Sequence, residues 1–270
     1  MSKRSTTYKI LVNIFSRISK RRRFLLSSLI LTLLMTVATF SSFDQAAIYL
    51  VLIVVATYIF TFTAILEGIS DYEWLLLFIA PIYFTVVFYL FYFFLPQRWL
   101  TRLPFIIIYG VSIYAILLSQ NIFNVGVTKS LQLFRAASSV NFLYLTVSAF
   151  LAYSLIISFR LDFWINFTLV MLSSIPLTLQ FLWSVNPSEV LEKELVKYGL
   201  TIAFILGQAA AILSFIPIET AILALFLTAC FYSLCGLLQA YLQDRLFIER
   251  IREYLLVMGF VLLIVILAMG

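Results

Sequence analysis

The segment around Trp99 has the residue types best suited to bind an anionic group. Arg98 and Arg102 flank Trp99, and all three residues lie between Pro96 and Pro104. Proline fixes the local backbone, and arginine can form paired hydrogen bonds with phosphate oxygens. A stiff turn of this kind at the surface of a membrane could hold a lipid phosphate or a polyprenyl phosphate. The same residues could instead serve only as interfacial anchors.

Two further charged residues complete this candidate headgroup site. Arg160 and Asp44 both fall in short turns that share the outer face with Arg98 and Arg102 if the N-terminus is cytoplasmic. Asp44, an acid in the first outer turn, is similar to the first-loop acid of lipid-linked glycosyltransferases, which carry a paired acid in a longer loop. That similarity covers one residue. It implies, as one alternative, a lipid-phosphate-dependent transferase acting at the outer face.

A second candidate surface lies in two charged segments near the end of the chain. Asn186 and Pro187 have the residue types of a helix cap and a first helical position, which predicts a helix that starts there and runs into the seventh span. Residues 244–254 contain no Pro or Gly, so we expect the eighth helix to extend through them. The apolar residues expected to pack on the segment around residue 190 are Leu246, Phe247 and Ile251. The charged residues of this candidate cytoplasmic partner surface are Glu189, Glu192, Lys193, Arg245, Glu249 and Arg252.

Several classes of catalytic and metal site are missing from the sequence. The chain has no histidine, which excludes the usual zinc sites and the Ser-His and Cys-His nucleophile systems. Its two cysteines, Cys230 and Cys235, would lie about 140° apart around one helix, so we interpret them as packing residues. The sequence also lacks a phosphate-binding P-loop and paired acids with metal spacing. We therefore expect no cofactor and no metal, and a non-enzymatic protein is favoured.

The composition identifies the solvent in which the elements must fold. Of the 270 residues, 64% are hydrophobic and 11% are charged, whereas a soluble domain has about 25% charged residues. The apolar residues form long unbroken runs rather than the alternating segments of a membrane β-barrel. The sequence thus predicts an all-α fold, a polytopic bundle of transmembrane helices.

Nine apolar runs predict nine membrane spans. They cover residues 24–43, 46–66, 74–95, 103–123, 140–159, 163–183, 198–216, 221–242 and 254–270. The last run barely reaches the thickness of a bilayer, so eight spans with a half-inserted C-terminal helix are the alternative. We treat residues 1–23 as a basic segment and residues 24–270 as one transmembrane domain.

The basic segment and the later turns together predict an orientation. Residues 1–23 carry eight of the 18 Lys and Arg residues and no acid, and the apolar positions of residues 8–20 recur at helical spacing. This pattern indicates an amphipathic interfacial helix bound to anionic headgroups. With the N-terminus cytoplasmic, 15 of the 18 cations lie on the inner side, as the positive-inside rule requires. We expect a bacterial cytoplasmic membrane protein with its C-terminus outside.

The polar and kinked positions within the spans leave more than one function open. The intramembrane polar residues are typical of hydrogen bonds between helices: Asn166, Ser173, Ser174, Gln180, Gln208 and Gln239. The ionisable residues map to turns and span ends, which disfavours an ion pump. Our leading hypothesis is a non-enzymatic membrane subunit or scaffold that binds another membrane protein or a second copy of itself, and not nucleic acid. Pro81 and Pro176 keep open a transporter or flippase of neutral or lipid-like solutes.

Overall fold

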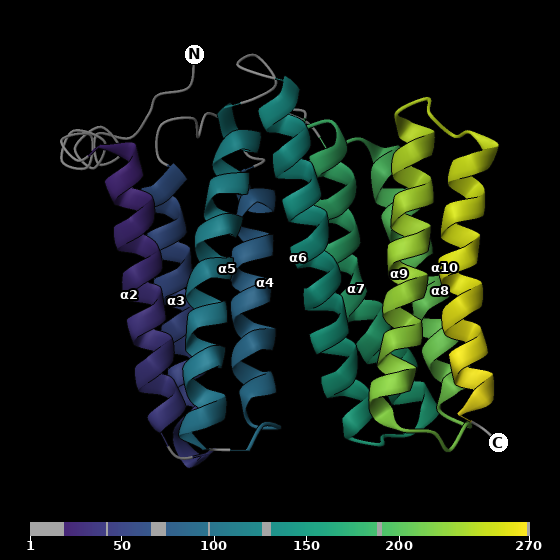
Figure 1. Cartoon of the computed structure of the whole chain (residues 1–270), viewed down its shortest axis with the longest axis horizontal. Helices are drawn as coiled ribbons and strands as arrows, with labels where there is room; N and C mark the ends of the chain where they lie inside the picture. Colours follow the sequence, from purple (N-terminus) through teal and green to yellow (C-terminus); the bar gives the residue numbers. More distant parts are fainter. Residues whose placement is uncertain are drawn as a thin grey trace. The chain divides into compact units, whose positions relative to one another are not determined.

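The described part of the chain forms only helices and their connections. The computed structural model describes residues 19–41, 43–65, 74–96, 98–125, 131–187 and 191–268. Its helices are α2 (Lys20–Phe40), η1 (Phe43–Gln45), α3 (Ala46–Ile65), α4 (Trp74–Tyr92), α5 (Trp99–Val125), α6 (Leu131–Ser158), α7 (Phe163–Val185), α8 (Lys193–Leu213), α9 (Thr220–Leu242) and α10 (Ile248–Leu267). The predicted all-α fold is confirmed (Figure 1).

Eight of the described helices, α2 to α9, are long and apolar enough to cross a membrane. The chain is therefore an integral membrane protein with a polytopic helical bundle of eight or nine spans. α10 is not one of these eight helices because its first turns carry too many charged residues: Glu249, Arg250, Arg252 and Glu253. The predicted amphipathic helix at residues 8–20 lies, up to residue 18, outside the described residues.

The chain divides into two compact units, Met1–Val140 and Asn141–Gly270. In the first unit, α2 and α4 each pack against α3 and α5. Three tyrosines, Tyr89, Tyr92 and Tyr109, are almost completely buried there, and the Tyr109 hydroxyl lies 3.1 Å from the Thr85 hydroxyl. Buried hydroxyls need such partners because membrane interiors offer no water.

In the second unit, α7 packs along α8, and α9 packs against both α8 and α10. Ala203 and Gly207 are buried in the α7–α8 contact, where a Cβ added to Gly207 would lie 2.9 Å from the backbone oxygen of Phe167. The small residues therefore let the two helices approach closely.

A buried amide network joins α6 to α7 within the second unit. The side chains of Asn141 and Gln180 exchange two hydrogen bonds of 3.2 Å, and Asn141 also donates to the Ser184 hydroxyl at 3.2 Å. This pairing confirms that Gln180 forms hydrogen bonds between helices, as predicted. Pro81 lies inside α4 and Pro176 inside α7, in different units, so a cavity between them stays a prediction.

The expected start at Pro187 of the helix that leads into the seventh span is wrong. Asn186 is the C-terminal cap of α7, Pro187 is not helical, and α8 starts at Lys193. The residue before a proline is disfavoured in the helical conformation. The Asn-Pro pair therefore ends the preceding helix instead of beginning the next one.

The expected extension of the eighth span is also wrong. α9 ends at Leu242, and Asp244 adopts a left-handed backbone conformation with a φ of 51°. Aspartate tolerates this conformation better than most residues, so the chain turns there without glycine. α10 then starts at Ile248, and the Phe247 side chain is 62% exposed instead of packed.

Candidate functional site

Arg102 lies in an aromatic cage formed by the ends of three helices in the first unit. The carbon at the centre of its guanidinium group is 4.1 Å from the centroid of the Phe40 ring and 5.8 Å from that of Trp99. Its Nε–H donates to the Tyr92 hydroxyl at 3.0 Å, and this hydroxyl donates to the backbone oxygen of Thr39 at 3.1 Å. Stacking and hydrogen bonding thus fix the orientation of the guanidinium.

The start of α5 places this arginine in the cage. The backbone oxygen of Arg98 accepts hydrogen bonds from the backbone N–H groups of Thr101 and Arg102 at 3.1 and 3.0 Å. The segment predicted as a stiff turn between two prolines is therefore the first turn of a helix, and Pro104 lies inside that helix. Arg98 is exposed, and the Trp99 ring is 70% exposed.

The five residues predicted as one headgroup site belong to both units. Arg98, Trp99 and Arg102 are neighbours on one helix end in the first unit. Asp44 is exposed in η1, and its carboxylate forms no ion pair with another described residue. Arg160 belongs to the second unit, so a single site containing all five residues stays a prediction.

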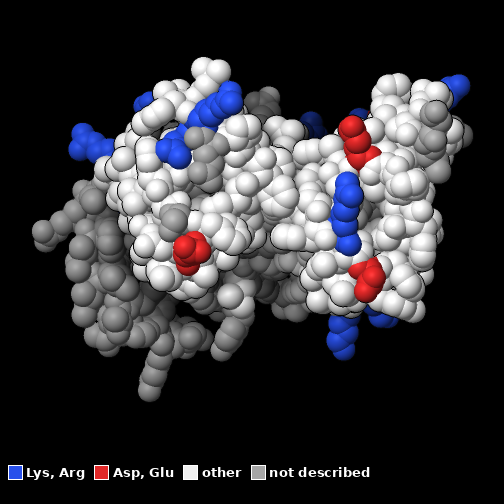
Figure 2. Space-filling view, turned by 90° about the horizontal axis from the view of Figure 1, so that it is seen from below, with Lys and Arg blue, Asp and Glu red and all other residues white. Residues whose placement is uncertain are grey.

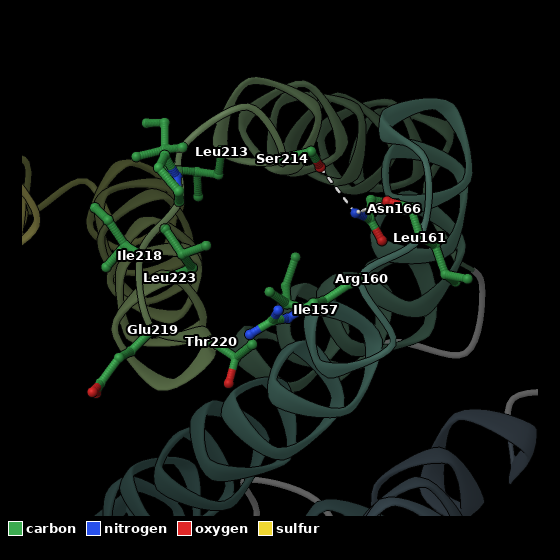
Figure 3. A pocket seen from close by; sticks show the side chains of 12 residues that line it. Ile157, Arg160, Leu161, Asn166, Leu213, Ser214, Ile218, Glu219, Thr220 and Leu223 are labelled. Carbon is green, nitrogen blue, oxygen red and sulfur yellow. Dashed lines mark hydrogen bonds between the residues drawn. The ribbon is translucent and has the colours of Figure 1, made fainter. Parts of the chain in front are cut away.

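Arg160 instead lines a pocket of its own unit. The pocket measures about 450 Å³ and lies between the α6–α7 and α8–α9 connections (Figure 3). Apolar residues such as Ile157, Leu213 and Leu223 form much of its wall. The polar residues that line it are Arg160, Asn166, Ser214, Glu219 and Thr220.

Asn166 links the two connections at the wall of this pocket. Its Nδ2 donates hydrogen bonds of 2.9 Å to the backbone oxygen of Leu161 and to the Ser214 hydroxyl. The predicted interhelical role of Asn166 is therefore confirmed for α7 and the residue that follows α8. The sequence did not indicate the pocket. The available signal was that Asn166 falls four residues after Asp162 and six after Arg160.

The candidate partner surface lies at the start of α8 and the end of α9, which are the helix ends farthest from this pocket. Its five described charged residues, Glu192, Lys193, Arg245, Glu249 and Arg252, are all exposed, and Glu189 lies outside the described residues. Leu246 and Ile251 line one apolar groove of about 410 Å³ together with Tyr198 of α8 and Tyr241 of α9. The groove joins the two charged segments that the sequence singled out.

A family model described as "Protein of unknown function (DUF5656)" matches residues 67–268. The chain belongs to this family. No curated protein and no solved structure matches it.

The family match includes both the pocket and the partner groove. It extends from before α4 to the end of α10, so Arg102, Tyr92 and Asn166 fall within it. Phe40, which stacks on Arg102, belongs to α2 and lies outside the match. The aromatic cage is thus completed by a helix that precedes the region defining the family.

The described residues carry few charges and few reactive groups. Viewed from below, most of the described surface is uncharged, with only isolated acidic and basic side chains (Figure 2). Among the described residues there is no group of three or more His, Cys, Asp or Glu side chains that could hold a metal ion. Cys230 and Cys235 are buried free thiols on α9, as expected of packing residues.

Proposed function

We propose that this protein is a non-enzymatic subunit or assembly component of a larger complex in the bacterial cytoplasmic membrane. In this proposal the N-terminus is cytoplasmic and the C-terminus is outside, because 15 of the 18 cations then lie on the inner side. The groove formed by α8, α9 and the start of α10 would face the cytoplasmic side and bind the partner.

The groove is the observation that carries this proposal. Its wall is almost entirely apolar, including Ile202 of α8, Leu237 and Leu238 of α9, and Ile251 of α10. Helices bind one another by fitting rows of side chains into grooves of this kind. The exposed charges at its rim, including Lys193, give the surface a polar border that can select a partner. The partner that fits is an apolar helix of another membrane protein with charges at its end.

Site-specific photocrosslinking in intact membranes tests the proposal. A photoreactive residue at Leu238 should give one discrete protein adduct, because this side chain lines the groove. Leu225 is the matched control, since it lies on the same helix, is 39% exposed and is not among the groove residues. Lipid adducts alone at Leu238, or the same adducts at both positions, would contradict the proposal. An adduct of twice the chain's mass would identify the partner as a second copy.

A second candidate function is recognition of a phospholipid headgroup at the start of α5. Arg102 is held through its Nε and its flat face, while no described residue accepts a hydrogen bond from its terminal NH₂ groups. These groups, with exposed Arg98 beside them, are free to bind phosphate oxygens. Replacing Arg102 with Gln should reduce the amount of anionic lipid that co-purifies with the chain, whereas Arg135→Gln, at an exposed arginine of α6, should not.

A further inference from the structure

The Asn166 side chain has a buried hydrogen-bond acceptor without a donor. Asn166 is 3% exposed, and its Oδ1 receives no hydrogen bond from any described residue. A buried polar atom in this state lowers stability by roughly the desolvation free energy of the group, so nearly all such atoms in proteins are paired. Asn166 is among the residues that line the pocket described above, where a ligand can supply the missing donor.

The orientation of the Asn166 amide follows from its neighbours. Both Nδ2 hydrogens are used, one on the backbone oxygen of Leu161 and the other on the Ser214 hydroxyl. That hydroxyl donates its own hydrogen to the backbone oxygen of Ala210 at 2.8 Å, so it can only accept from Asn166. Turning the amide around would place Oδ1 against two acceptors. The group without a partner is therefore an acceptor, and its ligand must be a donor.

The same pocket is lined by a positively charged side chain, that of Arg160. In Figure 3 the Arg160 side chain points toward Thr220, the first residue of α9, while the Glu219 carboxylate points away from the pocket. The guanidinium of Arg160 forms no ion pair with a described residue, and no side chain caps the first N–H groups of α9. A guanidinium beside an uncapped helix N-terminus favours a bound phosphate. The pocket thus combines two features: Arg160 and the N-terminus of α9 can bind an anion, and Asn166 Oδ1 can accept a hydrogen bond from a ligand.

The surroundings of the pocket indicate the depth of lipid headgroups. Three aromatic side chains beside it, Phe159, Trp164 and Phe215, are 63–70% exposed. Of these three, Trp164 is the residue type enriched at the interface between lipid and water, because its ring is amphipathic. The apolar wall, including Leu213 and Leu223, suits the glycerol and upper acyl carbons of a lipid. A volume of about 450 Å³ is also within the usual range for small-molecule sites.

We propose that this pocket binds a phospholipid whose headgroup carries a hydrogen-bond donor, as in phosphatidylethanolamine or phosphatidylglycerol. The phosphate lies between Arg160 and the N-terminus of α9, and the ammonium or hydroxyl donates to Asn166 Oδ1. Phosphatidylcholine has the same phosphate but no N–H or O–H donor, so it leaves Oδ1 unpaired. This site is independent of the partner groove and of the Arg102 cage.

Competition between lipids in native mass spectrometry of the detergent-solubilised full chain tests the inference. The lipids share acyl chains, and the wild type should retain phosphatidylethanolamine or phosphatidylglycerol about tenfold better than phosphatidylcholine, since one buried hydrogen bond distinguishes them. In Asn166→Leu this ratio should fall to near one. Arg160 has a φ of 48°, which asparagine tolerates, so Arg160→Asn should lower retention of all three lipids without changing the fold.

The control separates ligand binding from local structure. Ser214→Ala removes one hydrogen bond of the Asn166 amide but leaves Oδ1 in place, so the lipid ratio should stay high. Equal retention of all lipids by the wild type, or an unchanged ratio in Asn166→Leu, would overturn the proposal. A fall of the ratio in Ser214→Ala as large as in Asn166→Leu would also overturn it. Glycerophosphoethanolamine that competes as well as the whole lipid would identify a soluble ligand and refute the lipid.

Discussion

Replacing Gly207 with Ala should separate α7 from α8. The added Cβ would lie 2.9 Å from the backbone oxygen of Phe167 and 3.1 Å from the Cβ of Met171. An ordinary contact begins near 3.4 Å, so the helices must move apart by about 0.5 Å. A backbone oxygen within a helix cannot rotate away as a side chain can. The strain is therefore distributed over the whole α7–α8 contact.

The size of the effect follows from two opposing contributions. Alanine favours a helix over glycine by up to about 1 kcal/mol, whereas overpacking of a close contact costs about 1–3 kcal/mol. Gly259→Ala provides the matched control, because Gly259 also lies within a helix but has no atom within 4 Å of an added Cβ. The helix preference cancels between the two variants. Gly207→Ala should thus be less stable than Gly259→Ala by about 1–3 kcal/mol.

Equilibrium unfolding of the purified chain in mixed micelles measures this difference. Increasing fractions of SDS unfold the protein, and loss of helix is followed by circular dichroism. Free energies of unfolding for the two variants that agree within about 0.5 kcal/mol, the range of neutral substitutions, would refute the reasoning. α7 and α8 would then be farther apart than the structure places them, and the small residues of α8 would have another role.

Three further predictions concern the amide pair, the thiols and the basic segment. In a double-mutant cycle, Asn141→Leu and Gln180→Leu should show a coupling of about 0.6–1.7 kcal/mol, because each side chain is the other's buried partner. A membrane-permeant maleimide should label Cys230 and Cys235, which are 8% and 0% exposed, only after denaturation, as mass spectrometry of the intact chain would record. Neutral residues at exposed positions 21–22 should give mixed orientations when cysteines placed in the turns are labelled from one side.

The sequence predicted the membrane helices well because hydrophobicity decides them. A helix is the simplest structure that satisfies every backbone hydrogen bond of an apolar segment in lipid, so long apolar runs need no further information. Predicted spans 163–183 and 221–242 correspond to α7 (Phe163–Val185) and α9 (Thr220–Leu242). The fifth span was predicted from residue 140, whereas α6 starts at Leu131, since its first turns are more polar than lipid would allow.

The connections between the helices were predicted less well, because hydrophobicity does not determine where the chain turns. Near residue 187 the same Asn-Pro pair could cap a new helix or end an old one, and in the structure it ends α7. Near residue 244 the lack of Gly and Pro favoured a continuous helix, but an aspartate with a φ of 51° makes the turn. Such a turn brings α10 back along α9, where it buries Val261 and Val265. Local propensity is too weak to outweigh that burial.

The two intramembrane amides Gln180 and Asn166 show why a binding site was harder to predict than a helix. In the sequence both are single polar residues in apolar runs. Gln180 and Asn141 satisfy each other's donor and acceptor, so that network is closed. Asn166 uses both of its donors on Leu161 and Ser214, and its acceptor stays unpaired; Arg160 lines the same pocket. The same chemical group thus completes the protein's own packing in one place and requires an external donor in the other. Only the partners of each atom, and not the residue type, distinguish the two cases.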